Sequence, residues 1–334
     1  MSGPAILVTG GAGFIGSNIV ARLAARGDVD VVVCDRFGDV SDDKWRNIAK
    51  HDVADLVAPE AMTAWLGANA KRVTGVVHMG AISSTTERDV DLIAETNFRL
   101  SKIVWDWCAG ENKPLVYASS AATYGNGDQG FIDDNAYAAV ARLRPLNAYG
   151  WSKQLFDLYA LREAARGHAP PRWSGLRFFN VYGPNEYHKG GQKSVVAHMY
   201  PKAAAGETTR LFKSHHPDYV DGGQKRDFVH VDDCVDVAEW LLQREEGAGL
   251  INVGAGRART FLDLSHALYA AVHKQAKIEF VDTPEDIRRN YQYFTEADLT
   301  RLRALGYNRQ MTSIEAGVGD YVRRYLATDD PYVG

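Results

Sequence analysis

The chain has 334 residues, 46% of them hydrophobic, and a formal net charge of −4, which is typical of a globular protein with one large domain or two that share a core. It shows no basic excess of the kind nucleic-acid-binding proteins carry, no apolar run of the ~18 residues that span a membrane, and no basic, cleavable leader. Its three cysteines are far apart, which indicates free thiols in a reducing compartment, so we expect a cytoplasmic protein that binds neither nucleic acid nor membrane.

The first predicted unit is a strand, a glycine-rich turn and a helix. Residues 5–9 form a short apolar run, and residues 17–26 have the pattern of a helix. Between them, Gly10, Gly13 and Gly16 stand in the spacing G-x-x-G-x-x-G. Such glycines permit a tight turn and bring the backbone close to a pyrophosphate at the helix N-terminus. This context predicts a dinucleotide-binding site.

An acidic residue ends the second predicted strand, residues 31–35. Asp35 lies 19 residues after Gly16, where a carboxylate can hold the ribose hydroxyls of adenosine. Arg36 and Lys44 follow, and such cations can accommodate a 2′-phosphate. Asp35 therefore favours NAD and the two cations favour NADP, unless the cations are only solvated loop residues.

Further short apolar strands alternate with helices. Asn97 falls inside a helical pattern over residues 90–108, either facing solvent or bracing a neighbouring loop. Polar residues 119–125 follow the strand at 114–118, and side chains at the carboxyl end of a parallel strand belong to the ligand crevice. We also predict strands at 73–78, 173–178, 211–212, 225–231 and 250–254, and helices at 149–166, 195–205, 261–272, 295–305 and 314–326.

This alternation predicts the fold class α/β, with a doubly wound parallel sheet of Rossmann type and a second, smaller α/β substrate lobe. We expect residues 1–177 and 226–260 to form the dinucleotide-binding domain. Residues 178–225 and 261–334 would form the substrate-binding lobe.

Tyr149 and Lys153 lie four residues apart in a predicted helix and so share one face. A phenol titrates near pH ~10, and a neighbouring ammonium favours its ionised form. The pair is therefore a means of making a phenol act as a base near neutral pH. The spacing alone also fits a solvated helix, but its place after a glycine-rich turn favours catalysis. His215 and His216 have no third ligand at a recognised spacing, so we predict no metal site.

Several stretches carry a family resemblance over nearly the whole chain. TGGAGFIGSNIV at 9–20, YASSAATYG at 117–125 and the Tyr149-x-x-x-Lys153 pair resemble the extended short-chain dehydrogenase/reductase superfamily. A more diagnostic set resembles the ADP-glyceromanno-heptose 6-epimerase family of lipopolysaccharide core synthesis. It comprises SSTTE at 83–87, FFNVYGP at 178–184, HKGG at 188–191, KRDFV at 225–229 and YQYFTEADL at 291–299.

The resemblance implies an NADP-dependent isomerase, with NAD as the alternative, that forms a homo-oligomer. It would remove a hydride from carbon 6 of the heptose of ADP-D-glycero-D-manno-heptose and return it to the other face of a transient aldehyde. Tyr149 and Lys189 would be the acid/base groups on the two sides, Lys153 would lower the pKa of Tyr149, and Ser120 would steady the substrate oxygen. From the bare sequence, Lys189 reads instead as a mobile surface lysine between glycines.

The resemblance also implies the contacts of each ligand. The cofactor would meet Gly10, Gly13, Phe14, Ile15, Gly16, Asp35, Arg36, Lys44, Met79, Gly80, Ala81, Ile82, Ser83, Asn97, Lys153, Val181 and Lys189. The nucleotide sugar would meet Ser120, Asn180, Gly191, His198, Phe212, Lys213, Ser214, His215, Arg226 and Tyr291.

Two departures from the family bear on the substrate contacts. A serine stands in the family where this chain has Gly191, so that contact is lost or supplied by Ser194. The loop at 215–224 is longer than usual, which puts the diphosphate and adenine end of the site in question.

Alternative functions share the fold. A UDP-hexose 4-epimerase is the nearest, and a dTDP-glucose 4,6-dehydratase is disfavoured because residues 121–123, after Ser120, include no carboxylate. A non-catalytic dinucleotide sensor would not need the Tyr149–Lys153 pair, which this chain keeps.

Overall fold

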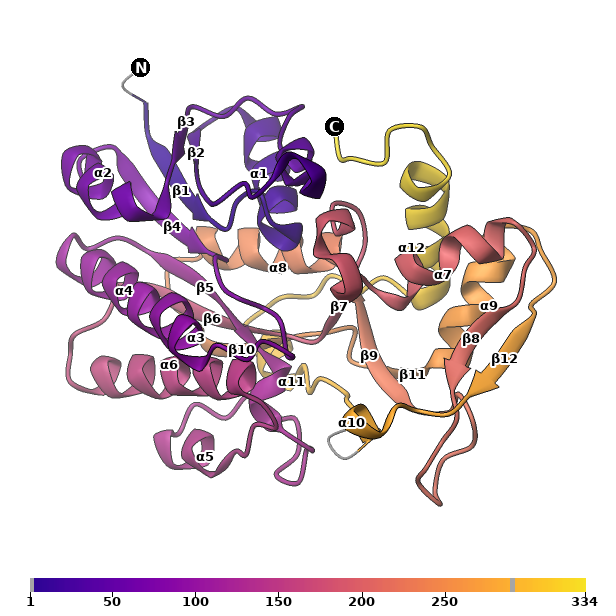
Figure 1. Ribbon diagram of the computed structural model, residues 1–334. Coiled ribbons are helices and arrows are strands. Elements are labelled where there is room, and N and C mark those ends of the chain that lie inside the picture. The colour runs from indigo at the N-terminus through magenta and orange to yellow at the C-terminus, as the bar shows by residue number, and fades with distance from the viewer. Residues whose placement is uncertain (1–2, 289–291) are drawn as a thin grey trace.

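The computed structural model describes residues 3–288 and 292–334, and its framework is a seven-stranded parallel sheet (Figure 1). The strand order is β10-β6-β5-β4-β1-β2-β3, so the chain winds outward from β1 in one direction and then in the other. Ligands of such sheets bind outside the carboxyl ends of the strands, where the winding direction changes. The strands are β1 (Ala5–Thr9), β2 (Asp30–Cys34), β3 (Asp55–Val57), β4 (Val73–His78), β5 (Leu115–Ser120), β6 (Trp173–Phe178) and β10 (Gly249–Val253).

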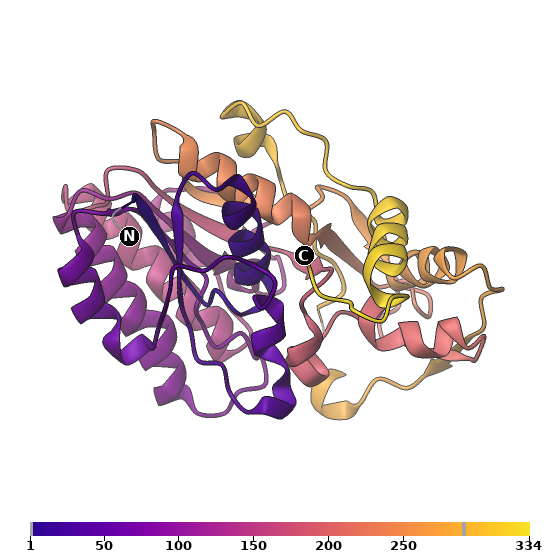
Figure 2. The same cartoon turned by 90° about the horizontal axis from the view of Figure 1, so that it is seen from above.

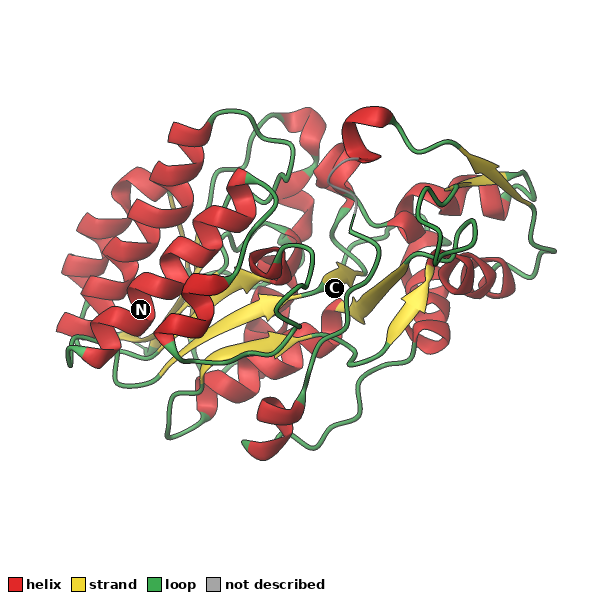
Figure 3. Ribbon diagram, turned by 90° about the horizontal axis from the view of Figure 1, so that it is seen from below, coloured by secondary structure: helices red, strands yellow, loops and turns green. Residues whose placement is uncertain are grey.

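Helices cover both faces of this sheet, because alternate strand residues supply two separate cores (Figures 2 and 3). On β1, Ile6 and Val8 belong to the core under α1 (Phe14–Arg26) and α8 (Val231–Gln243). Ala5 and Leu7 belong to the core on the other face. That core includes α2 (Met62–Asn69), α4 (Leu100–Gly110) and α6 (Ala148–Ala165). The predicted doubly wound α/β fold is confirmed.

A smaller lobe with its own core stands beside the large sheet (Figure 1). It contains two short sheets, ordered β11-β9-β7 and β12-β8. Their strands are β7 (Asn180–Tyr182), β8 (Thr209–Phe212), β9 (Lys225–His230), β11 (Ala258–Thr260) and β12 (Ile278–Val281). The helices in its core are α7 (Val195–Ala204), α9 (Phe261–Ala271) and α12 (Ile314–Tyr321).

Several predicted boundaries differ from those observed. The helix expected at 17–26 begins at Phe14, because Gly13 leads directly from the turn into the helix. The helix expected at 90–108 is a run of α3 (Val90–Ile93), a π-helical stretch (Ala94–Arg99) and α4. The helix expected at 295–305 is reduced to α11 (Thr300–Ala304), because Thr295 and Ala297 donate backbone hydrogen bonds to Lys225 and Asp227 instead.

Sequence periodicity also missed elements that are short or lack a one-sided apolar pattern. They are α2, α5 (Tyr137–Arg142), α10 (Glu285–Arg288), β11 and β12. No helix in the described part of the chain is long and apolar enough to cross a membrane.

Candidate active site

A cleft of about 1110 Å³ opens at the carboxyl ends of the central strands, between the large sheet and the smaller lobe. It brings together the glycine-rich turn, the Tyr149 helix and the segment that carries Lys189. The predicted site residues that line it are Gly10, Gly13, Phe14, Ile15, Gly16, Asp35, Lys44, Met79, Gly80, Ala81, Ser83, Ser120, Tyr149, Lys153, Asn180, Val181, Lys189, Gly191, His198, Phe212 and Arg226.

The glycine-rich turn forms an open backbone cradle at the start of α1. Gly10 has φ 63°, and a Cβ there would lie 2.6 Å from the backbone nitrogen of Gly80. Thr9 Oγ1 accepts a hydrogen bond from that nitrogen at 3.1 Å, which ties β1 to the loop after β4. The nearest atom to a Cβ on Gly13 would be Gly10 O at 3.1 Å. The backbone fits the close approach of a pyrophosphate to a helix N-terminus.

A lysine, not an arginine, is the cation beside the acidic residue of β2. Lys44 Nζ donates to Asp35 Oδ1 at 2.7 Å and to Arg36 O at 2.7 Å, while Asp35 Oδ2 accepts from Ala12 N at 2.9 Å. The Arg36 guanidinium is exposed and pairs with Glu60, and it does not line the cleft. The predicted cofactor contact of Arg36 is therefore wrong for this conformation.

Asn97 braces the loop after β4. It is fully buried; its Oδ1 accepts from Ile82 N at 2.8 Å, and its Nδ2 donates to Ile82 O at 2.9 Å and to Ser152 Oγ at 3.0 Å. Neither Asn97 nor Ile82 lines the cleft, so both support the predicted cofactor loop from behind.

Lys153 is held deep in the cleft floor. It is 5% exposed, and its Nζ donates to Ala118 O at 2.8 Å. Burial lowers the pKa of Lys153 to about 8, an effect that the Asp157 carboxylate partly offsets. The ammonium is therefore charged at neutral pH and is poised to lose its proton just above it.

The Tyr149 phenol differs from the expectation. Burial raises its pKa above the usual value of 10, and only the hydrogen bond with Ser120 lowers it. The predicted lowering by Lys153 is wrong for this state, because burial outweighs the favourable contact that the phenolate receives.

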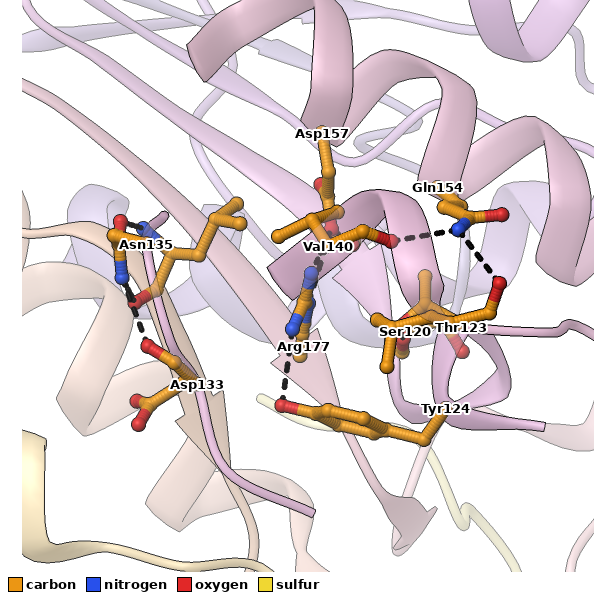
Figure 4. A network of polar contacts seen from close by, with 12 residues as sticks. Ser120, Thr123, Tyr124, Asp133, Asn135, Val140, Gln154, Asp157 and Arg177 are labelled. Carbon is orange, nitrogen blue, oxygen red and sulfur yellow. Dashed lines mark hydrogen bonds and ion pairs between the residues drawn. The ribbon is translucent and has the colours of Figure 1, made fainter. Parts of the chain in front are cut away.

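Beneath this pair lies a buried ionic network that sequence reasoning missed (Figure 4). Asp157 is fully buried and Arg177 is 1% exposed. Arg177 Nε donates to Asp157 Oδ2 at 3.0 Å, and its Nη1 donates to Tyr124 Oη at 3.1 Å. Ser119 Oγ donates to the same carboxylate at 2.9 Å, and burial raises the pKa of Asp157. The available signals were an acid four residues after Lys153 and an arginine inside an apolar strand.

Lys189 lies on the short helical segment Tyr187–Gln192 and is half-buried. Its Nζ lies 5.3 Å from the ring centre of Phe14. Burial lowers the pKa of Lys189, and the carboxylate of Glu186 opposes that shift. The alternative of a mobile surface lysine therefore does not describe its surroundings.

The serine considered as a substitute for the missing contact at Gly191 is already engaged. Ser194 Oγ donates to Glu186 Oε1 at 2.7 Å and caps α7 by accepting from Ala197 N at 3.3 Å. Gly191 itself is exposed, with open space where a Cβ would stand.

Part of the predicted nucleotide-sugar set lies off the cleft. Lys213 pairs with Asp282 at 3.5 Å, and Ser214 N donates to Asp221 Oδ1 at 2.8 Å. His215 lines a second cavity of about 940 Å³. Tyr291 lies outside the described residues. Arg226 is in the main cleft, 7% exposed, with its Nη1 donating to Lys225 O at 2.9 Å.

The chain resembles known proteins over nearly its whole length. Residues 6–254 match the family model described as the NAD dependent epimerase/dehydratase family. The chain is 44% identical to the ADP-L-glycero-D-manno-heptose-6-epimerase of Fusobacterium nucleatum, over 98% of this chain and 100% of that protein. It is 46% identical to the protein of the same name from Nitratidesulfovibrio vulgaris (strain DP4), over 98% and 99%.

Solved structures give the same picture. The Helicobacter pylori ADP-L-glycero-D-manno-heptose-6-epimerase superposes with a TM-score of 0.78 at 26% identity, over 96% of both chains. The Thermus thermophilus UDP-glucose 4-epimerase in complex with NAD superposes with a TM-score of 0.71 at 26% identity, over 95% of this chain and 97% of that one.

Proposed function

Because the chain belongs to the NAD dependent epimerase/dehydratase family, we propose that it converts ADP-D-glycero-D-manno-heptose to ADP-L-glycero-D-manno-heptose, a precursor of lipopolysaccharide core. The observation that carries this proposal is that one cleft holds two acid/base side chains of separate origin. Tyr149 comes from α6, and Lys189 comes from the segment after β7. Inverting a hydroxyl-bearing carbon requires such groups at two positions, since the hydroxyl points in opposite directions in the two epimers.

The cradle fits a nicotinamide dinucleotide, which when bound would accept a hydride from the sugar and return it. Gly10, Gly13 and Gly16 would admit the pyrophosphate, and Lys153 would donate to the nicotinamide ribose. We propose NADP as the preferred form, because Lys44 neutralises Asp35 and stands ready for a 2′-phosphate. NAD remains the alternative, in which Asp35 would accept from the ribose hydroxyls.

Each catalytic side chain has a proton suited to its step. Tyr149, hydrogen-bonded to Ser120, would take the proton of the carbon 6 hydroxyl as hydride leaves. The charged Lys153 would stabilise the phenolate as it forms. The aldehyde would rotate about its bond to carbon 5, and Lys189 would protonate the new alkoxide when hydride returns to the other face. A lysine with a lowered pKa transfers protons readily near neutral pH.

A UDP-hexose 4-epimerase is the second candidate, favoured by the fold shared with the Thermus thermophilus enzyme. It would need acid/base help at one position only, and Lys189 would then have no step. The position of Lys189 in the cleft therefore favours the 6-epimerase.

A direct test incubates the purified enzyme with ADP-D-glycero-D-manno-heptose or with UDP-glucose and follows the sugar signals by NMR. We expect an equilibrium mixture of heptose epimers from the first substrate and no UDP-galactose from the second. Turnover of UDP-glucose with no change in the heptose would overturn the proposal.

A further inference from the structure

Behind Lys189, three buried asparagines join the start of α1 to the segment that leads into Tyr187–Gln192. Asn18 is 5% exposed, Asn47 is 1% exposed and Asn185 is fully buried. They come from α1, from the helical turn Lys44–Asn47 and from the turn after β7, respectively. A side-chain amide both donates and accepts hydrogen bonds, so one asparagine can hold two backbone segments together.

Asn47 bridges the glycine-rich turn and the Lys189 segment. Its Nδ2 donates to Ala12 O at 2.8 Å and to Asn185 O at 3.1 Å. Because both partners are carbonyl oxygens, the amide nitrogen must be the atom that faces them. The same nitrogen lies 3.2 Å from Nδ1 of His188, whose pKa burial lowers to about 4. The neutral ring accepts at Nδ1, so Asn47 also orients the side chain next to Lys189.

Asn185 makes the reciprocal contacts. Its Nδ2 donates to Ser17 Oγ at 3.0 Å and to Asn47 O at 3.3 Å, and its Oδ1 accepts from Val333 N at 3.2 Å. Its φ of 72° lies in the left-handed region, which asparagine tolerates better than most residues do. The backbone turn and the side-chain bonds at this position therefore depend on each other.

Asn18 completes the set at the residue under the Lys189 ammonium. Its Nδ2 donates to Phe14 O at 2.9 Å and to Pro184 O at 3.1 Å. Phe14 also presents its ring to Lys189 Nζ. The cradle and the Lys189 segment are thus referenced to the same turn of α1.

We propose that Asn18, Asn47 and Asn185 form a clasp that positions Lys189 against the cofactor cradle, so that the clasp is specific to the Lys189 half of the reaction. This inference rests on the proposed function, in which Lys189 is an acid/base group. It assigns no contact of the asparagines with substrate. They act through the position of Lys189, where a misplacement near 1 Å can reduce a rate by about 10²-fold.

The test variant is Asn185→Gly, because glycine adopts a φ of 72° without strain and only the side-chain bonds are lost. We expect kcat for epimerisation to fall by roughly 10- to 100-fold, with bound dinucleotide retained. Dismutation of a carbon 6 aldehyde analogue supplies the comparison. In it, water adds to one aldehyde, which is oxidised to the acid, and the hydride reduces a second aldehyde to the alcohol. We expect this reaction, which needs no rotation, to change by less than about threefold.

A double variant separates positioning from general support. Adding Asn185→Gly to Lys189→Met should leave the residual epimerisation unchanged, since the clasp then has nothing to position. Ser17→Ala, which removes one acceptor of Asn185, should act in the same direction with a smaller loss. Asn135→Ala is the matched control: Asn135 bonds Asp133 O, Leu250 O and Leu250 N away from the cleft, and its loss should leave epimerisation unchanged.

Equal losses from Asn185→Gly in both backgrounds, or a parallel loss of dismutation, would overturn the clasp and leave the proposed function intact. A full epimerisation rate in Lys189→Met alone would overturn the proposed function, and the clasp with it.

Discussion

The two acid/base side chains of the cleft are held by different kinds of structure. Tyr149 and Lys153 stand on the 18-residue helix α6, which packs on the central sheet above the buried Asp157–Arg177 pair. Lys189 stands on a six-residue segment, and Gly190 beside it has φ 53°. One wall is secondary structure with ionic support, and the other is a turn fixed by side-chain amides. The difference teaches that a rigid donor site and an adaptable one can share a cleft.

The largest effect should come from Gly13, on which both walls depend. Gly13→Val would place a side chain in the pyrophosphate cradle beside Gly10 O. We expect loss of copurifying nicotinamide and of every activity, measured by absorbance and by turnover. Gly67→Val is the control, since a Cβ there meets open space on α2. Full cofactor occupancy in Gly13→Val would show that the turn is misplaced.

The ionic support of the α6 wall is tested by Asp157→Asn. This change leaves the buried Arg177 guanidinium without its countercharge, so the free energy of unfolding should fall by about 3–5 kcal/mol. Denaturant titration measures this. Asp106→Asn removes an acceptor of Tyr159 Oη from a carboxylate that is 47% exposed, and should lower the same free energy by less than about 1 kcal/mol.

The same variant has a signature in the pH profile. The account needs Lys153 charged, so kcat should decline as pH rises through about 8. Because Asp157 raises the pKa of Lys153, its removal should move this decline to lower pH. An unshifted profile would separate Asp157 from Lys153 and leave it a purely structural residue.

The adaptable wall is tested by Gly190→Ala. A left-handed φ penalises alanine by roughly 1–2 kcal/mol, so the Lys189 segment should shift and epimerisation should slow severalfold. Cofactor binding should not change. Gly191→Ala is the adjacent control, because it has no positive φ and meets open space. Equal rates for both variants would show that the turn at Gly190 does not set the position of Lys189.

The smallest effect separates the two cations beyond β2. Lys44→Ala should weaken NADP more than NAD, because Lys44 is the cation in the cleft. Arg36→Ala should weaken NADP by a smaller factor, since its guanidinium already pairs with Glu60. Titration of each dinucleotide measures both. A greater loss from Arg36→Ala would show that the arginine leaves Glu60 when the 2′-phosphate binds.

The sequence predicted the α6 wall better than the other. Apolar runs, glycine spacing and the four-residue step from Tyr149 to Lys153 are local patterns, and each fixes local geometry. The Asp157–Arg177 pair was missed because it joins a helix to a strand through burial that no local pattern expresses. The raised pKa of Tyr149 was missed for the same reason.

The bonds that surround Lys189 could be predicted still less. Asn47 and Asn185 are separated by 138 residues, and asparagine in a loop ordinarily signals a turn. Lys44 was found as a nearby cation, but its choice over Arg36 depended on Glu60, which lies on the short helical turn that precedes α2. Nothing in the local pattern around Arg36 indicated that pairing.

The most direct test of the account compares two variants in two reactions. General acid/base help is worth roughly 10²–10⁴-fold, so Tyr149→Phe and Lys189→Met should each lose epimerisation by such a factor while keeping the dinucleotide. Dismutation of the aldehyde analogue should survive in Lys189→Met and fail in Tyr149→Phe, because hydride transfer at one face needs only the Tyr149 wall. Epimerisation of the natural substrate by Lys189→Met at the unmodified rate would contradict the account and leave a single acid/base group.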